Sequence, residues 1–290
     1  MHIAILEPYP EINSAYLTYL ADAWHTLIPF WTEHKPSDID AIIIRSKIRV
    51  DKSLLKKYSA LSHIFRAWVW VDNIDLESIQ QKKIKIINTP GANTHATAEL
   101  ILWWILSLLR NTYMPWKTFD DRFTMMWSEL RWKTIWLVWF GHIGEKVYQL
   151  IHAVGENTFL IYDPYIDPQA IKEQNIHYVS KKEELFTQSD IISFHIPLSQ
   201  KTKNFLSKND FQLLKKTVKI INTSRWGIID EDGLISFLQN NPAAGAYIDV
   251  WEEEPQNPKR WLLRLPNCII TPHIGSMTEE ANKLMHVFVF

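Results

Sequence analysis

The chain has 290 residues, 47% of them hydrophobic, which is enough for two compact domains of ordinary size. Its formal net charge of −1, without a cluster of basic residues, argues against a nucleic-acid-binding protein. A single cysteine, Cys268, excludes an internal disulfide framework and favours a cytoplasmic location. The apolar stretch 100–109 is too short to span a bilayer and the N-terminus lacks signal-peptide features, so we expect no membrane association.

The first part of the chain alternates strand and helix signals. We predict strands at 3–6, 41–44, 64–67 and 85–87, and helices at about 13–23 and 76–80. A turn over 88–93 then leads into a long apolar helix from Thr94 to Arg110. Arg45 and Ser46 follow the end of a strand, where ligands gather in open α/β sheets, although a solvated turn is the plainer interpretation.

After a connecting stretch of poor periodicity, 114–130, a strand, turn, helix and strand are predicted over 134–162. Gly141-His142-Ile143-Gly144 opens the helix. Asp163 follows the second strand, about 20 residues after the glycine turn, where a dinucleotide-binding βαβ unit holds the ribose 2′-hydroxyl. The first glycine of G-x-G-x-x-G is missing, because Trp139 occupies its position. A bicyclic side chain there would fill the space of the pyrophosphate.

The alternation continues beyond Asp163 and predicts a parallel doubly wound sheet. Strands are predicted at 191–195, 218–222, 246–250 and 268–271, and helices at 181–186, 211–214 and 232–239. Polar segments follow the last three strands, at 222–225, 249–255 and 271–275. Because parallel strands of one sheet point the same way, we expect these segments to meet at one edge.

An arginine, a carboxylate and a histidine occur in these segments. Arg225 could hold a substrate carboxylate, and Glu254 with His273 could form a carboxylate-supported general acid/base. Taken singly, each has a plainer interpretation as an ion-paired arginine, part of a solvated acidic run, or a structural histidine. The combination favours catalysis. Zinc-ligand spacings and a G-x-S-x-G elbow are absent from the sequence, so neither a dedicated metal site nor a serine nucleophile is expected.

Several segments together resemble the D-isomer-specific 2-hydroxyacid dehydrogenases, in the order found in that family. They are IIRSKIRV, RAWVWVDNID, INTPGANT, LRWKTIWLVWFGHIG, INTSRWGIIDEDGL, YIDVWEEEP and ITPHIGSMTEEA. The resemblance implies a flavodoxin-like substrate domain over residues 1–95 with the tail 280–290, and a Rossmann NAD-binding domain over residues 96–279. It also implies an NAD-dependent oxidoreductase that forms a homodimer or homotetramer.

Roles for single residues follow from the same resemblance. Arg225 would orient the substrate, His273 would exchange the hydroxyl proton, and Glu254 would hold His273. Cofactor contacts are implied for Val69, Trp139, Gly141, His142, Ile143, Gly144, Asp163, Ile196, Thr223, Ser224, Asp249 and Gly275. Substrate contacts are implied for Arg45, Ser46, Trp68, Val69, Trp70 and Asn93. Asp163 favours NAD over NADP, because its carboxylate would repel a 2′-phosphate.

Within the family, the chain is most similar to the members that oxidise 3-phosphoglycerate to 3-phosphohydroxypyruvate in serine biosynthesis. Glycerate, hydroxypyruvate and D-lactate are the alternative substrates. An NAD-sensing corepressor or scaffold on the same fold is the alternative from another class, and an inactive homologue is a third.

Tryptophan stands at many positions where this family has glycine. The chain holds 8 Gly and 14 Trp, whereas an average usage of about 7% would give roughly 20 glycines. The exchanged positions are Trp68, Trp70, Trp127, Trp132, Trp136, Trp139 and Trp226, and Trp24 lies where glycine would be natural. Because one residue type replaces one other, we hypothesise that UGA codons of this gene encode glycine. With real tryptophans, poor folding and no cofactor binding are expected.

Overall fold

The computed structural model describes residues 1–7, 23–45, 47–67, 71, 73–113, 127–171, 176–250 and 261–289. The chain divides into two compact units, which are described separately. Unit 1 consists of Met1–Asn93 and Met277–Phe290, and unit 2 of Thr94–Ser276. Most of the predicted helix at 13–23 and most of the connecting stretch 114–130 lie outside the described residues.

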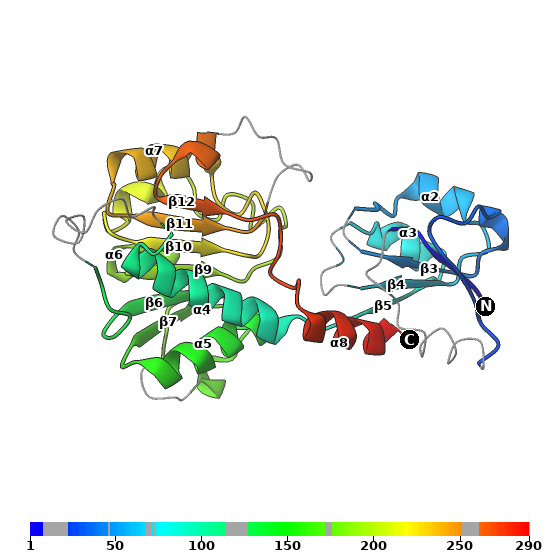
Figure 1. Ribbon diagram of the computed structural model, residues 1–290, viewed down its shortest axis with the longest axis horizontal. Helices are drawn as coiled ribbons and strands as arrows, with labels where there is room; N and C mark the ends of the chain where they lie inside the picture. Colours follow the sequence, from blue (N-terminus) through cyan, green and yellow to red (C-terminus); the bar gives the residue numbers. More distant parts are fainter. Residues whose placement is uncertain are drawn as a thin grey trace. The chain divides into compact units, whose positions relative to one another are not determined.

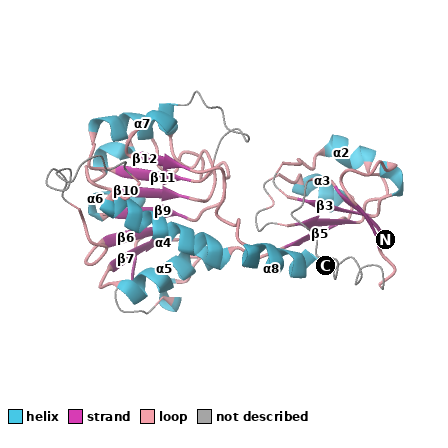
Figure 2. Cartoon of the chain, in the orientation of Figure 1, coloured by secondary structure: helices cyan, strands magenta, loops and turns pink. Residues whose placement is uncertain are grey.

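Unit 1 is built on a five-stranded parallel sheet (Figures 1 and 2). The strands lie in the order β2-β1-β3-β4-β5, the order of flavodoxin-like sheets. Their bounds are β1 His2–Ile5, β2 Thr26–Ile28, β3 Ala41–Ile44, β4 His63–Arg66 and β5 Lys85–Asn88. The helices are α2 Lys52–Lys57, α3 Leu76–Gln81 and α8 Glu279–Val289, with a 3-10 turn at Pro36–Asp38.

The short helices of unit 1 begin at aspartate caps. The Asp51 carboxylate accepts a hydrogen bond from Leu54 N at 2.9 Å, and the Asp75 carboxylate accepts one from Ser78 N at 3.1 Å. Each bond satisfies an amide that the first helical turn leaves unpaired. These helices also bury apolar side chains against one face of the sheet, in a cluster that includes Leu55 and Ile79. Capping and burial together explain why such short segments are helical.

Unit 2 is built on a seven-stranded parallel sheet in the order β12-β11-β10-β9-β6-β7-β8. The bounds are β6 Thr134–Val138, β7 Thr158–Tyr162, β8 Ile176–Tyr178, β9 Ile191–Phe194, β10 Lys219–Asn222, β11 Gly245–Ile248 and β12 Cys268–Ile270. The helices are α4 Thr94–Arg110, α5 His142–Val154, α6 Lys182–Gln188 and α7 Glu231–Asn240, with 3-10 turns at Pro168–Ala170, Asp210–Leu213 and Trp261–Arg264. The strand order reverses between β6 and β9, where doubly wound sheets bind ligands.

Both faces of the unit 2 sheet are buried. Successive side chains of each strand point to opposite sides, so each strand contributes to the apolar cluster on either face. In β6, Ile135 and Leu137 join one apolar cluster, while Trp136 and Val138 join the other. Helix α4 packs against α5, β10 and β11 (Figure 1). Apolar clusters thus cover both faces of the sheet, and the loops at its edge follow strands that are hydrogen-bonded to one another.

The structure confirms the predicted fold class of two parallel α/β sheets. The prediction missed β2, β8 and α2, because three-residue edge strands and a six-residue helix are too short to show periodicity. The segment predicted as a helix at 211–214 forms the 3-10 turn Asp210–Leu213. Strand β6 ends at Val138 rather than Phe140, because Trp139 adopts a left-handed backbone with φ of 69°.

Candidate active site

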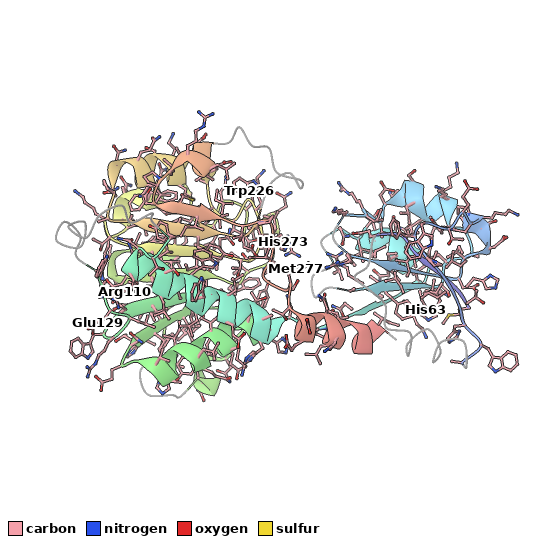
Figure 3. All side chains as sticks on the ribbon, viewed as in Figure 1. His63, Arg110, Glu129, Trp226, His273 and Met277 are labelled. Atoms are coloured by element: carbon pink, nitrogen blue, oxygen red, sulfur yellow. The ribbon has the colours of Figure 1, made fainter. Side chains whose placement is uncertain are left out.

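The residues that follow neighbouring strands of unit 2 are held at one level by backbone hydrogen bonds. Asp249 N, after β11, donates to Asn222 O at 2.9 Å, and Thr271 N, after β12, donates to Ile248 O at 3.1 Å. Figure 3 labels Trp226 and His273 at the same end of this unit. The structure therefore brings the segments carrying Arg225, Asp249 and His273 to one edge of the sheet, as the sequence predicts.

The glycine turn after β6 is fastened to the end of β7 by Asp163. One carboxylate oxygen accepts a hydrogen bond from Phe140 N at 3.0 Å, and the other accepts one from Tyr165 N at 2.8 Å. The side chain is almost fully buried. Because each carboxylate oxygen has a second lone pair, Asp163 can still accept a hydrogen bond from a ribose hydroxyl.

Helix α5 presents an anion-binding end at the same edge. Its N-cap is Gly141, with no side-chain cap, and its first residues are His142, Ile143 and Gly144. The amides of a first helical turn have no partner within the helix, and the helix dipole places partial positive charge there. A pyrophosphate is the ligand that this arrangement suits best.

Trp139 lies in the turn that leads to this helix. Its indole packs edge-on against Tyr165, with the ring centroids 5.2 Å apart. Tyr165 is the second residue after Asp163, so the indole lies beside the carboxylate predicted to hold the ribose. A clash between this indole and a bound dinucleotide stays a prediction from the motif.

Arg225 is carried by a turn that Asn222 organises. The buried Asn222 side chain accepts hydrogen bonds from Ser224 N at 3.1 Å and Ser224 Oγ at 2.8 Å, and it donates one to Arg225 O at 3.0 Å. The guanidinium of Arg225 donates to Ser224 O at 2.8 Å and is partly buried. Thr223, which precedes Ser224, is partly buried as well. The turn therefore fixes the backbone of Arg225, whose guanidinium is suited to binding a carboxylate.

His273 is carried by a loop that Asp249 anchors. The Asp249 carboxylate, 0% exposed, accepts hydrogen bonds from Ile274 N and Gly275 N, both at 2.8 Å, and from the Thr271 hydroxyl. Burial raises the pKa of this carboxyl group, while these hydrogen bonds oppose the rise. His273 itself has a left-handed backbone with φ of 57°. Histidine is among the residues that tolerate this region, so the conformation is compatible with a tight turn in this loop.

Gly275 closes this loop against α4. Its carbonyl accepts a hydrogen bond from Thr97 Oγ1 at 3.0 Å. A Cβ on Gly275 would lie 3.1 Å from Asp249 Oδ2 and 3.5 Å from Thr97 Oγ1. A side chain at this position would therefore press on the Asp249 carboxylate, whereas its distance to α4 is an ordinary contact.

In unit 1, Glu7 holds the segment that carries Arg45. The Glu7 carboxylate accepts hydrogen bonds from the amides of Arg45 at 3.0 Å, Lys47 at 3.1 Å and Ile48 at 2.8 Å. The Asn73 side chain donates to Arg45 O at 3.2 Å and to Ile48 O. Both side chains thus shape the turn predicted to meet a substrate. The Arg45 guanidinium reaches Met277, with 4.0 Å between Nη2 and Sδ.

Asn93, the other described substrate candidate, is buried, and its Oδ1 has no hydrogen-bond partner within the structure. Ile196, a cofactor candidate, is fully buried after β9. The remaining candidates, Ser46, Trp68, Val69, Trp70 and Glu254, lie outside the described residues.

Sequence reasoning missed His195. Its imidazole is buried, neither ring nitrogen has a hydrogen-bond partner, and its Cδ2 would lie 3.4 Å from a Cβ on Gly144. Burial lowers its pKa to about 3, so the ring is neutral. Its position at the end of the strand predicted over 191–195 was the signal available. Asn222 and Glu7 were also missed, because their hydrogen bonds give no periodic pattern.

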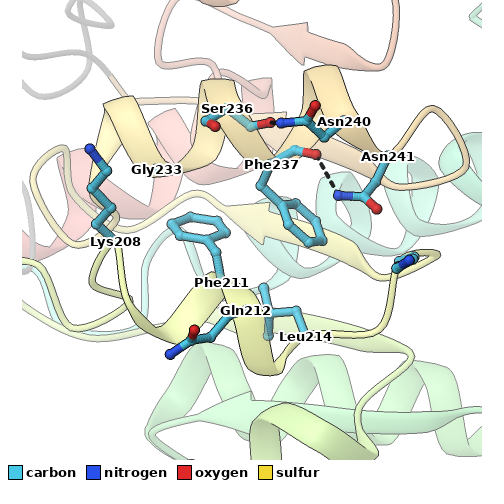
Figure 4. Close-up of a pocket in the computed structure, with 10 residues that line it drawn as sticks. Lys208, Phe211, Gln212, Leu214, Gly233, Ser236, Phe237, Asn240 and Asn241 are labelled. Atoms are coloured by element: carbon cyan, nitrogen blue, oxygen red, sulfur yellow. Dashed lines mark hydrogen bonds between the residues drawn. The ribbon is translucent and has the colours of Figure 1, made fainter.

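A surface pocket of about 300 Å³ lies elsewhere in unit 2, between α7 and the 3-10 turn Asp210–Leu213 (Figure 4). Phe211 and Phe237 line it, and none of the predicted site residues does. Among the described residues, there is no group of three or more His, Cys, Asp or Glu side chains suited to a metal ion. Nor does any helix in the described ranges have the length and apolarity needed to cross a membrane.

Residues 102–275, most of unit 2, match the D-isomer specific 2-hydroxyacid dehydrogenase family, NAD binding domain. The chain belongs to this family. It is 37% identical over 257 residues to D-3-phosphoglycerate dehydrogenase of Methanocaldococcus jannaschii, covering 86% of this chain and 48% of that relative. It is 33% identical over 252 residues to hydroxypyruvate reductase of Thermotoga maritima, a match that covers 85% of this chain and 81% of that relative.

Among solved structures of similar fold is the NAD⁺-bound 3-phosphoglycerate dehydrogenase of Entamoeba histolytica. It has a TM-score of 0.81 and 28% identity, and the match covers 100% of this chain and 93% of that one. The D-2-hydroxyacid dehydrogenase family therefore accounts for the fold of both units, and unit 2 contains its NAD-binding domain. The match covers only about half the length of the phosphoglycerate dehydrogenases of Methanocaldococcus jannaschii and Bacillus subtilis, 48% and 46%.

Proposed function

We propose that the protein catalyses reversible hydride transfer between C2 of a D-2-hydroxyacid and NAD. The observation that carries this proposal is the arrangement of the Arg225 turn and the His273 loop after neighbouring strands of the NAD-binding domain. NAD accepts the hydride when it is bound. The anion-binding end of α5 and the unfilled lone pairs of Asp163 fit this cofactor.

Three side chains would carry the chemistry. The Arg225 guanidinium binds the substrate carboxylate through paired N–H donors and so orients C2. His273 accepts the hydroxyl proton as the C2–H bond breaks, and it returns a proton in the reverse reaction. Glu254, by resemblance to the family, holds the protonated His273.

The substrate we propose is 3-phosphoglycerate, oxidised to 3-phosphohydroxypyruvate. Its support is the similarity to phosphoglycerate dehydrogenases and the Arg45 turn that Glu7 shapes, which offers a cation for a phosphate group. The Thermotoga maritima relative, of which the match covers 81%, favours hydroxypyruvate or glycerate as the second candidate.

Turnover with purified native protein tests the proposal. NAD is offered with 3-phosphoglycerate, glycerate and D-lactate in turn, and the formation of NADH is followed. We expect the highest kcat/KM with 3-phosphoglycerate. NADH binding without turnover of any of these acids would instead support a cofactor-sensing scaffold, and the lack of both would indicate an inactive homologue.

We also propose that the protein is a homodimer or homotetramer in the cytoplasm. Trp103 and Leu106, on one side of α4, are 62% and 41% exposed. Large apolar side chains exposed together on a helix are typical of a surface that another subunit covers. Light scattering of the native protein measures the assembly, and a monomer at all concentrations would contradict it.

A further inference from the structure

We infer that the native protein carries glycine, and not tryptophan, at positions 24, 132 and 139, and that 104 is a true tryptophan. The backbone carries this inference. Trp24, Trp132 and Trp139 have φ of 60°, 61° and 69°, in the left-handed region. Gly91 and Gly227 are the glycines found there, with φ of 84° and 80°.

A left-handed backbone is rare for residues with a bulky side chain, because the Cβ approaches the following carbonyl oxygen. Glycine has no Cβ and adopts this conformation without strain. The described residues other than glycine with positive φ are Trp24, Lys83, Asn111, Trp132, Trp139, Asn204 and His273. Asparagine and histidine are tolerated in this region, whereas tryptophan, the most frequent residue type of this set, is among the least suited.

The Trp132 indole donates a solvent-exposed hydrogen bond from Nε1 to Glu156 Oε2 and lies against the Arg131 guanidinium. Exposed contacts of this kind contribute little, and the strained indoles at 24 and 132 gain little from burial that would offset the strain. Their exposed fractions are 92% and 68%. Trp132 lies in the turn before β6, where its amide donates to Glu156 O at 3.0 Å and fixes the turn. This backbone hydrogen bond does not depend on the side chain at 132, so any residue could make it. The left-handed conformation that the turn adopts there favours glycine.

Trp139 is the position at which the identity matters for function. Its amide donates to Tyr162 O at 2.7 Å, and the next residue, Phe140, bonds to Asp163. The left-handed turn between these bonds leads the chain into α5 at the cofactor edge. A glycine here completes G-F-G-H-I-G and removes the ring that lies against Tyr165.

Trp136, in the middle of β6, is another position where the family has glycine, and it shows a different conflict. It is fully buried among Phe186, Phe194 and Phe205, and its indole N–H has no hydrogen-bond partner. A buried donor without a partner is uncommon in native proteins. The indole N–H of Trp104 also lacks a partner, so this feature alone does not separate the two positions. We extend the inference to position 136 because the family has glycine there.

Trp104 differs from Trp24, Trp132 and Trp139 in its backbone conformation. It lies in the middle of α4 with a helical backbone, is partly buried, and stacks on Tyr247 with ring centroids 4.7 Å apart. Its indole has a clear packing role, so a tryptophan is expected there. A single gene would then hold both kinds of codon, UGA at 136 and 139 and UGG at 104.

Tandem mass spectrometry of the protein isolated from its own cells tests the inference. Trypsin releases the peptide 134–146, which holds both Trp136 and Trp139, and the peptide 86–110, which holds Trp104. We expect the first peptide to lack the mass of two indolylmethyl groups and the second to retain tryptophan at 104. Tryptophan at 139, or glycine at 104, would overturn the inference, and so would UGG codons at 132 and 139. Because this measurement needs no activity, its outcome is independent of the proposed function.

Discussion

A Cβ atom placed on Gly144 would lie 2.5 Å from the carbonyl oxygen of Trp139. Real Cβ atoms do not approach a backbone oxygen so closely. The first turn of α5 can therefore lie against the turn after β6 only because residue 144 has no side chain. This contact sets where the amides of α5 lie relative to β6. The last glycine of the motif thereby allows α5 to pack closely against β6.

Replacing Gly144 by alanine is expected to destabilise the fold by about 1–3 kcal/mol, because the turn must move to admit the methyl group. Gly141→Ala is the matched control, since a Cβ there meets nothing within 4 Å and φ is −82°. Urea unfolding of both variants measures the difference. Equal stabilities of G144A and G141A would show that the turn moves freely.

Trp139→Gly is expected to relieve about 1–2 kcal/mol of left-handed strain and to raise NADH affinity at least about tenfold, because the indole leaves the cofactor edge. Lys83→Gly is the control, since Lys83 has φ of 55° and lies in unit 1. It should relieve similar strain without changing NADH affinity. Fluorescence titration of the two variants and the unaltered recombinant chain separates the effects, and equal affinities would contradict a role for this side chain.

Long, strongly patterned elements were predictable from the sequence. Helix α4 runs from Thr94 to Arg110 and β3 from Ala41 to Ile44, the bounds that the apolar pattern predicts. The edge on which Arg225 and His273 lie was also predictable, because parallel strands place their carboxyl ends together.

The supporting contacts of the site were not predictable, because they join residues far apart in the sequence. Glu7 binds amides at 45, 47 and 48, and Asp249 binds those at 274 and 275. No local pattern signals such bonds. The resemblance implies a cofactor role for Asp249, which stays a prediction, whereas the structure shows that this carboxylate anchors the loop of His273.

Asp249→Asn is expected to lower kcat more than it raises KM. Its new amide group would face an N–H of the loop, Ile274 or Gly275, and leave a buried donor unpaired, at a cost of about 1–3 kcal/mol. His273 would lose its fixed position. Steady-state kinetics and urea unfolding of this variant test the expectation, and Asp249→Glu, which keeps the charge, indicates whether geometry matters. Unchanged kcat in D249N would rule out the anchoring role.

Glu7→Gln is expected to raise KM for the hydroxyacid about tenfold with little change in kcat, because one loop amide would lose a charge-assisted hydrogen bond. The variant thereby tests whether the Arg45 turn contacts substrate. Asp75→Ala is the control: it removes the cap of α3 and costs about 1 kcal/mol of stability, but leaves this turn intact. If both variants change KM equally, the effect is a general loosening of unit 1.

His195 is expected to make the protein sensitive to acid. Burial holds its pKa at about 3 in the folded protein, whereas a free histidine titrates near about 6.5. The unfolded chain therefore binds an extra proton as pH falls below about 6.5, and stability decreases down to the folded pKa. The loss between pH 6.5 and 5 should be about 2 kcal/mol, from about 1.4 kcal/mol per pH unit. His195→Phe should remove this part of the pH dependence, as measured by urea unfolding across the range. An equally steep decline in the variant would assign the acid sensitivity to other groups.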